Sequence, residues 1–246
     1  MPMVSQDDIT RYVEMNIPNF HSAKLESLTK LKLLEILTRK NPYLFRAKGL
    51  TAPRDLVKAI LDAYLSSSEE TLLGGFLEDF AIYVCRKTYR GDKSAVNGLD
   101  LEFIRDKTKY FVSIKSGPNW ANSEQIKKLR SAFNEARKIY AQHKGGLKAE
   151  CINGCCYGKQ PRKNEHKGDY IKLCGQRFWE LISGDTDLYL KIVEPIGHQA
   201  KERNAEFLAK YELVIDSFTN IFRRHFCDAD NLIIWDKLTK ASCEAP

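Results

Sequence analysis

The stretch LDLEFIRDKTKYFVSIKS, residues 99–116, decides the fold of this chain. Apolar and polar side chains alternate over 96–104 and again over 110–116, and the polar segment RDKTK separates the two runs. Alternation with a period of two is typical of a strand with one buried face, so the stretch predicts a β-hairpin. We expect the two strands to pair symmetrically about the turn, with Arg105 opposite Tyr110.

The expected register puts different side chains on the two faces of the hairpin. One face is apolar and carries Leu101, Phe103, Val112 and Ile114. The other carries two carboxylates, a hydroxyl and an amine, from Asp100, Glu102, Ser113 and Lys115. In this register Glu102 faces Ser113 and Asp100 faces Lys115, with opposed Cβ atoms ~4.5–5.5 Å apart.

The polar face carries the groups that phosphodiester hydrolysis needs. Mg²⁺ prefers hard oxygen ligands and takes one or two carboxylates together with waters and substrate phosphate. A lysine beside them orients or deprotonates an attacking water. Asp100 and Lys115 therefore indicate metal-assisted hydrolysis, and a salt-bridged surface hairpin without chemistry is the alternative.

Helical patterns precede the hairpin. We expect four helices there, beginning at Ser5, Ser22, Thr51 and Ser67, with Asn41-Pro42 stopping the second and the fourth running to about Lys87.

A second set of elements follows the hairpin. We expect a long helix from Asn122 or Ser123 to Gly145-Gly146, strands within 149–158 and 169–173, and helices from about Gln176 to Phe226 with a break near Pro195. This order implies an α/β fold, a mixed sheet flanked by helices, with a helical annex from the two ends of the chain. We expect a single domain over 1–246, with a helical part at 1–65, a core at 66–182 and a second helical part at 183–246.

Charge and hydropathy restrict the class of protein. The 246 residues include 39 basic and 32 acidic ones, and twelve of the basic residues but four of the acidic ones lie between Lys127 and Lys172. Such a basic segment favours a nucleic-acid partner. No apolar run approaches the ~18 residues of a membrane span, and the amino terminus is too polar for a signal peptide. We therefore expect a cytoplasmic protein.

The polar residues of the hairpin resemble the catalytic hairpin of PD-(D/E)XK nucleases, with Ser113 in place of the middle acid. The segments KNPYLFRAKG (40–49), SSSEETLLGGFLEDFAIYV (66–84) and SGPNW (116–120) resemble type II restriction endonucleases of the PmeII-like family. The resemblance covers about residues 20–180. It implies a restriction-endonuclease-like fold, Mg²⁺-dependent cleavage of double-stranded DNA at a short sequence to leave 5′-phosphate ends, a homodimer, and a cognate DNA methyltransferase.

The serine leaves open which acid completes the metal site with Asp100. Related enzymes supply this acid from the helix before the hairpin, where Glu78 lies between Gly74 and Ile82 on the helical wheel. Glu78, Glu102 or both are candidates, and Ser113 is expected to orient a water.

Several other residues are candidates for contacts to DNA. They are polar or basic and lie in loops or at a helix start: Arg46, Lys48, Asn119, Asn122, Gln125, Arg162 and Lys163. Ordinary helix capping is the alternative for Asn122, and a solvated loop is the alternative for Arg162.

Four of the seven cysteines, Cys151, Cys155, Cys156 and Cys174, lie near His143 and His166 in the sequence. The spacing lacks the paired CxxC pattern of a structural zinc site, so we expect buried, reduced thiols.

Two other functions fit the same residues. Loss of the middle acid is compatible with a catalytically degenerate DNA-binding module. The superfamily also includes structure-specific repair and junction nucleases.

Overall fold

A computed structural model describes residues 3–142, 146–159 and 161–244 of the chain. The chain forms two compact units. Unit 1 consists of Met1–Ile17 and Leu73–His198, and unit 2 consists of Pro18–Leu72 and Gln199–Pro246. That the units together form one domain, as the sequence predicts, stays a prediction.

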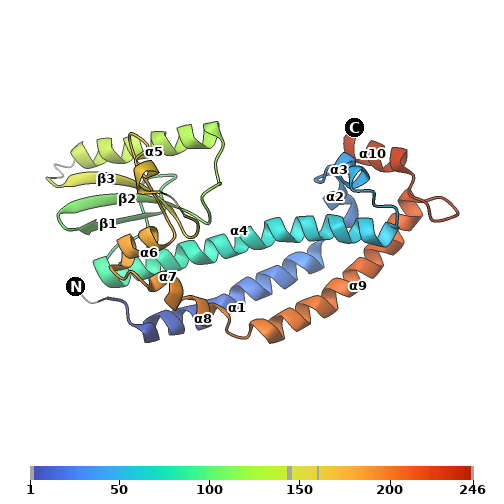
Figure 1. Ribbon diagram of the computed structural model, residues 1–246, viewed down its shortest axis with the longest axis horizontal. Coiled ribbons are helices and arrows are strands. Elements are labelled where there is room, and N and C mark those ends of the chain that lie inside the picture. The colour runs from blue at the N-terminus through green and yellow to red at the C-terminus, as the bar shows by residue number, and fades with distance from the viewer. Residues whose placement is uncertain (1–2, 143–145, 160, 245–246) are drawn as a thin grey trace. The chain divides into compact units, whose positions relative to one another are not determined.

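Unit 1 contains a mixed sheet with the strand order β1-β2-β3-β4 (Figure 1). The strands are β1 (Leu101–Arg105), β2 (Thr108–Lys115), β3 (Lys148–Cys155) and β4 (Ile171–Cys174). β1 runs antiparallel to β2, whereas β3 is parallel to both β2 and β4. All four strands lie where the sequence predicts strands, and the predicted mixed sheet flanked by helices is confirmed.

The register of the hairpin differs from the expected one by two residues. Arg105 pairs with Thr108 and Glu102 pairs with Phe111, so the expected pairing of Arg105 with Tyr110 is wrong. Asp106 and Lys107 both have positive φ, 48° and 58°, and form a two-residue turn with the twist that hairpins favour. Because the shift is even, every side chain keeps its predicted face.

Helices cover both faces of the sheet. On the polar face, α5 (Ser123–Gln142) packs Leu129, Phe133 and Ala136 against Phe111 and Cys151. On the apolar face lie α6 (Gln176–Ser183) and the part of α4 (Pro53–Tyr89) that belongs to unit 1 (Figure 1). There the rings of Phe80 and Trp179 lie 5.8 Å apart.

The helices before the hairpin are longer than predicted. α1 (Gln6–Lys30) continues through Pro18 and past Ser22, so no new helix begins at Ser22. α4 is one helix where two were predicted, and the Ser67 hydroxyl, expected to cap a helix, instead donates to the Ala63 carbonyl (3.2 Å) from within α4. Before α4, Asn41 caps the short helix α3, since its side chain accepts the Tyr43 N–H (3.0 Å).

The remaining helices are short, apart from α9. They are α2 (Leu33–Leu37), α3 (Pro42–Ala47), α7 (Leu188–Lys191), α8 (Val193–Ile196), α9 (Ala200–Phe226), α10 (Trp235–Cys243) and the 3₁₀ turn η1 (Arg162–Asn164). The predicted break near Pro195 is present, whereas α3 and α10 are not among the predicted helices. α5 ends at Gln142, and Gly145 lies outside the described residues. No helix in the described part of the chain is long and apolar enough to cross a membrane.

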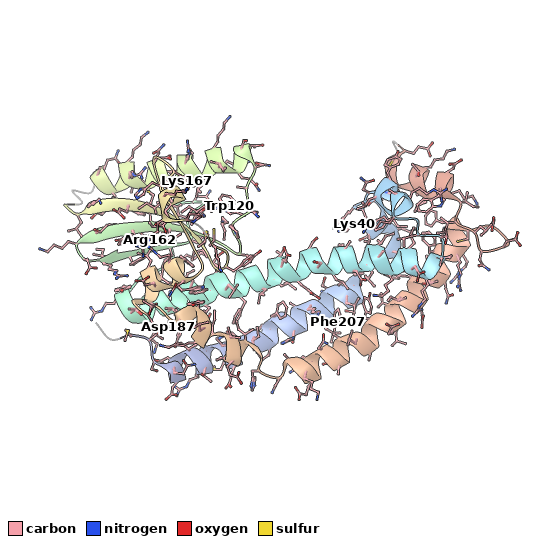
Figure 2. All side chains as sticks on the ribbon, in the orientation of Figure 1. Lys40, Trp120, Arg162, Lys167, Asp187 and Phe207 are labelled. Carbon is pink, nitrogen blue, oxygen red and sulfur yellow. The ribbon has the colours of Figure 1, made fainter. Side chains whose placement is uncertain are left out.

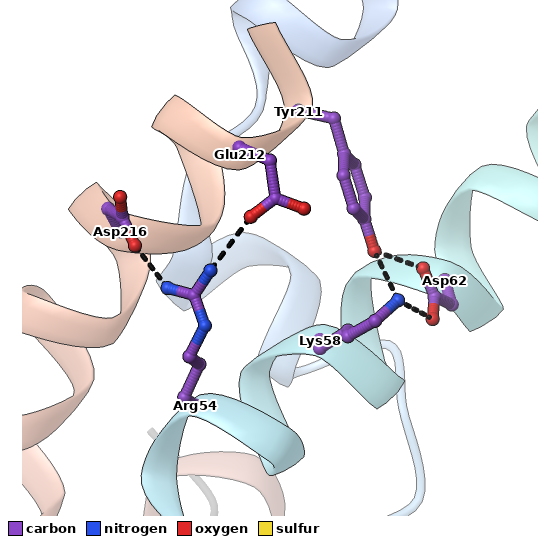
Figure 3. Close-up of polar contacts among 6 residues, drawn as sticks. All are labelled: Arg54, Lys58, Asp62, Tyr211, Glu212 and Asp216. Atoms are coloured by element: carbon purple, nitrogen blue, oxygen red, sulfur yellow. Dashed lines mark hydrogen bonds and ion pairs between the residues drawn. The ribbon is translucent and has the colours of Figure 1, made fainter. Parts of the chain in front are cut away.

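Unit 2 is a helical assembly with its own apolar core, in which Leu28, Ile60 and Phe222 are buried. Polar contacts join α4 to α9 in this unit (Figure 3). Arg54 bonds to Glu212 (2.7 Å) and to Asp216. Lys58, Asp62 and Tyr211 form a second group, in which the Lys58 amine donates to the Tyr211 hydroxyl (3.2 Å).

Candidate active site

Asp100 lies immediately before β1 and is fixed by its neighbours on β2. Its backbone N–H donates to the Val112 carbonyl (2.9 Å). Its Oδ2 atom accepts the Ile114 N–H (2.6 Å) and the Ser113 hydroxyl (3.4 Å). The carboxylate therefore has one orientation, and among the described residues its Oδ1 atom accepts no hydrogen bond.

Lys115, the last residue of β2, brings an amine to the same carboxylate. Its Nζ atom lies 3.8 Å from Asp100 Oδ2, and both side chains are partly exposed. The amine also lies 5.4 Å from the centre of the Trp120 ring. The predicted proximity of Asp100 and Lys115 is thus present, although Asp100 adjoins Ser113 in the observed register and does not face Lys115 directly.

Glu78, the candidate acid that precedes the hairpin, lies on α4. The helix passes close to the end of β2 at Gly74, where a Cβ atom would lie 3.4 Å from the Ser116 Cβ. Glu78 follows one turn later and is half-buried. Burial raises the pKa of its carboxyl, and the negative charge of Asp100 raises it further, while Lys115 and Lys93 oppose these effects. Asp100 and Lys115 are thus among the charges that act on the Glu78 carboxyl.

Glu102, the other candidate acid, is engaged elsewhere. Its carboxylate forms an ion pair with Lys109 (2.9 Å) and accepts the Ala95 N–H (3.4 Å). It pairs with Phe111 across the hairpin and not with Ser113 as expected.

Ser113 occupies the position of the missing acid and is buried. Asn153 on β3 lies beside Ser113 and is buried as well, although it is not among the residues predicted for the site. The Asn153 amide donates to the Ser113 carbonyl (3.4 Å) and accepts the Trp120 indole N–H (3.1 Å). A polar residue inside the apolar run AECINGCC was the signal that could have identified Asn153.

The candidates for DNA contact fall into three groups. Asn122 and Gln125 cap α5 reciprocally, because each side chain accepts the backbone N–H of the other (3.0 and 2.9 Å). The exposed residues Asn119, Arg162 and Lys163 belong to loops of unit 1 or to η1. The last two residues, Arg46 and Lys48, belong to unit 2, where Arg46 stacks 5.1 Å from the Trp235 ring. Contact with DNA stays a prediction for all seven.

The clustered cysteines are buried and free. Cys155 lies beside Cys174 in the sheet, and burial together with this neighbour raises the pKa of the Cys155 thiol to about 12. Within the described residues no three His, Cys, Asp or Glu side chains gather as a metal site, and His143 lies outside that part of the chain.

Asp100 and Glu78 nevertheless suit Mg²⁺. The ion needs only one or two protein carboxylates when waters and a substrate phosphate supply its other ligands. These two residues offer hard oxygen donors beside an amine that can serve as a cationic or proton-transferring group.

Comparison with known proteins gives one family. The family model described as type II restriction endonuclease EcoO109I matches residues 7–204, which include all of β1–β4 and α4–α6. No curated protein matches the chain.

Proposed function

Because this chain belongs to the family of the type II restriction endonuclease EcoO109I, we propose that it cleaves double-stranded DNA at a short specific sequence. Family membership makes the chain a nuclease, and DNA its substrate. The proposal adds dependence on Mg²⁺, a defined recognition sequence, and products that carry a 5′-phosphate and a 3′-hydroxyl. The observation that carries it is the 3.8 Å separation of the Lys115 amine and the Asp100 carboxylate on neighbouring strands.

Each residue of the site has a part in the proposed hydrolysis. Asp100 and Glu78 would hold the metal ion, which when bound neutralises charge at the scissile phosphate. Lys115 positions or activates the attacking water. Ser113 holds Asp100 in place through its hydroxyl, 3.4 Å from Oδ2. Attack on phosphorus breaks the bond to the 3′ oxygen, which leaves and takes up a proton.

We also propose an oligomeric state, a partner enzyme and a location in the cell. Two strands need two sites, so we propose a homodimer that acts on a palindromic sequence. A DNA methyltransferase that protects the same sequence would complete the restriction system, and the cytoplasm is the proposed location. The narrower likeness to PmeII-like enzymes is also part of the proposal.

Two alternatives differ in what they do to DNA. A degenerate module would bind DNA without cutting it, and the buried Ser113 in place of an acid favours this alternative. A repair or junction nuclease would cut by structure and without preference for a sequence.

Digestion of DNA of known sequence separates these functions. We expect purified protein with Mg²⁺ to give discrete fragments from plasmid or phage DNA, with ends that map to one short sequence. Lys115→Ala is expected to abolish cutting and to retain binding when Ca²⁺ replaces Mg²⁺.

Lys148→Ala is a matched control, because Lys148 is an exposed lysine of the same sheet, on β3, that pairs with Glu150. The control is expected to cut like the wild type. Undiminished cutting by Lys115→Ala would remove Lys115 from the mechanism, and binding without any cutting by the wild type would support the degenerate module.

A further inference from the structure

A cavity of about 360 Å³ lies beside the candidate active site in unit 1. Its lining includes the side chains of Trp120, Arg130, Asn153, Lys167, Tyr170 and Lys172. Trp120 and Lys167, both labelled in Figure 2, are among the residues that line it. The volume is within the range of protein ligand sites, which is roughly 300–1,000 Å³.

Trp120 joins the cavity to the active site. The ring that lines the cavity also has the Lys115 amine 5.4 Å from its centre. Two residues that line the cavity lie in one row across the strands with Ser113. Asn153 on β3 pairs with Ser113 on β2, and Lys172 on β4 pairs with Asn153. Neighbouring strands lie ~4.8 Å apart, so the cavity begins at about that distance from Ser113.

The charge of the cavity points to an anion. Three of the six residues named are cationic, and no carboxylate occurs among the described residues that line it. Arg130 contacts Asp169 at 3.4 Å, but both side chains are substantially exposed and such pairs are weak. Arg130 also donates to the Lys167 carbonyl (3.2 Å), which ties the two cations together.

The shape of the cavity is fixed by backbone contacts. Lys167 N–H donates to the Tyr170 carbonyl (2.9 Å) and closes a turn that contains Gly168 with φ 88°. The Lys172 amine donates to the Pro118 carbonyl (2.7 Å) and so joins β4 to the segment that carries Trp120. The faces of the aromatic rings already have cationic partners, since Lys115 lies over the Trp120 ring and Arg130 over the Tyr170 ring. This arrangement favours a phosphate over a stacked base.

We propose that the cavity holds a backbone phosphate of the cleaved DNA strand, near the scissile one, and that Arg130, Lys167 and Lys172 are positioning residues. The inference rests on the proposed function, because it takes DNA as the ligand. A DNA strand that runs from the Asp100–Lys115 pair across β3 toward β4 reaches the cavity within a few nucleotides. Each nucleotide adds about 3.4 Å along the duplex axis. The contact would set where the strand lies on the site without reading its sequence.

The salt dependence of DNA binding tests this role. A phosphate contact contributes a slope of about −0.9 to a plot of log K against log salt concentration. We expect Lys167→Ala, measured with duplex DNA in Ca²⁺, to make the slope less negative by up to about 0.9 and to weaken binding equally for cognate and unrelated sequences. If Lys167→Ala does not fold, Lys167→Gln is measured in its place.

Lys128→Ala is the matched control, because Lys128 lies on α5 outside the cavity lining and pairs with Glu124 at 3.1 Å. Its slope is expected to equal that of the wild type.

Neutral methylphosphonates, placed singly along the cleaved strand, locate the contact. One position near the scissile bond should weaken wild-type binding more than it weakens Lys167→Ala binding, because only Arg130 and Lys172 remain in the variant. An unchanged slope for Lys167→Ala, or equal sensitivity of both proteins at every position, would overturn the phosphate site while DNA cleavage stood. If Lys167→Ala weakened binding only to DNA with one particular base pair, Lys167 would instead contact a base, and the phosphate site would also be overturned. Failure of the wild type to bind DNA would contradict the proposed function itself.

Discussion

Asn153 shows how a residue without chemistry of its own can hold a reactive group in place. Its amide connects the Trp120 indole to the backbone of Ser113, and Ser113 in turn contacts Asp100. Each of these bonds forms in a buried or half-buried environment, where an unpaired donor or acceptor is costly. The orientation of the acid thus depends on an amide one strand away.

Replacement of this amide should lower stability. We expect Asn153→Ala to reduce the free energy of unfolding by ~1–3 kcal/mol, because the Trp120 indole N–H and the Ser113 carbonyl lose a partner. Denaturant unfolding followed by tryptophan fluorescence measures the change.

Asn134→Ala is the control, because Asn134 is exposed on α5 and its side chain accepts a long bond from Arg137 (3.5 Å). A loss below about 0.5 kcal/mol for Asn153→Ala would contradict the supporting role of this amide.

The sequence predicted the polar face residue by residue but not what supports it. Alternation alone assigns Asp100 and Lys115 to one face, because a strand has a strict period of two. Asn153 and Lys172 join them only through the pairing of β2 with β3 and of β3 with β4. These strands are far apart in the sequence, and their relative register is set by packing, which no local pattern reveals.

Two adjacent glycines on α4 have different surroundings. A Cβ atom on Gly74 would touch Ser116 at 3.4 Å, whereas one on Gly75 would have nothing within 4 Å. At Gly74 the helix thus lies close to the end of β2, with room for a Cβ atom but not for a large side chain, and Glu78 follows one turn later on the same helix.

A larger side chain should separate the helix from the strand. We expect Gly74→Leu to lower the rate of DNA cleavage by about 10²-fold, since a displacement of 1 Å can cost that much, and to leave binding in Ca²⁺ intact. Gly75→Leu should cut normally and gain up to ~1 kcal/mol of stability, because glycine is a poor helix former. Equal rates for the two variants would show that the approach of α4 does not matter for catalysis.

The sequence predicts which segments are helices and which are strands better than it predicts where the helices begin and end. The strands and α5 follow from periodicity, but helices were ended too early at Ser22 and Ser67. A serine can cap a helix or bond back to the preceding turn, as Ser67 does with Ala63, and the local sequence does not decide between them. The hairpin register failed for a similar reason, since Asp106-Lys107 is not a typical sequence for a turn with two positive φ angles.

At the scale of the whole molecule, each unit is assembled from distant parts of the chain. The core of unit 2 combines Leu28, Ile60 and Phe222, which lie in three separate helices. Amphipathic patterns predict such helices, but they do not identify the partners of each apolar face. The sequence therefore indicated a helical annex without the composition of its core.

The proposed homodimer gives a prediction at this scale. The described part of one chain brings together one Asp100–Lys115 pair, so cleavage of both strands at one site needs a second copy. We expect sedimentation in solution to give twice the 28.2 kDa of a single chain. Mixed dimers of wild type and Lys115→Ala should nick one strand. A monomer that cuts both strands in a single encounter would contradict the dimer.

The tight turn at Asp106-Lys107 limits how the length of this hairpin can change during evolution. Adding one residue to either strand would rotate every following side chain through the sheet, burying the amine and exposing its apolar neighbours. Insertions or deletions between the acid and the lysine are therefore tolerable in pairs or within the loop itself. Outside that loop, the spacing between the two groups can accordingly change in evolution only by even numbers of residues.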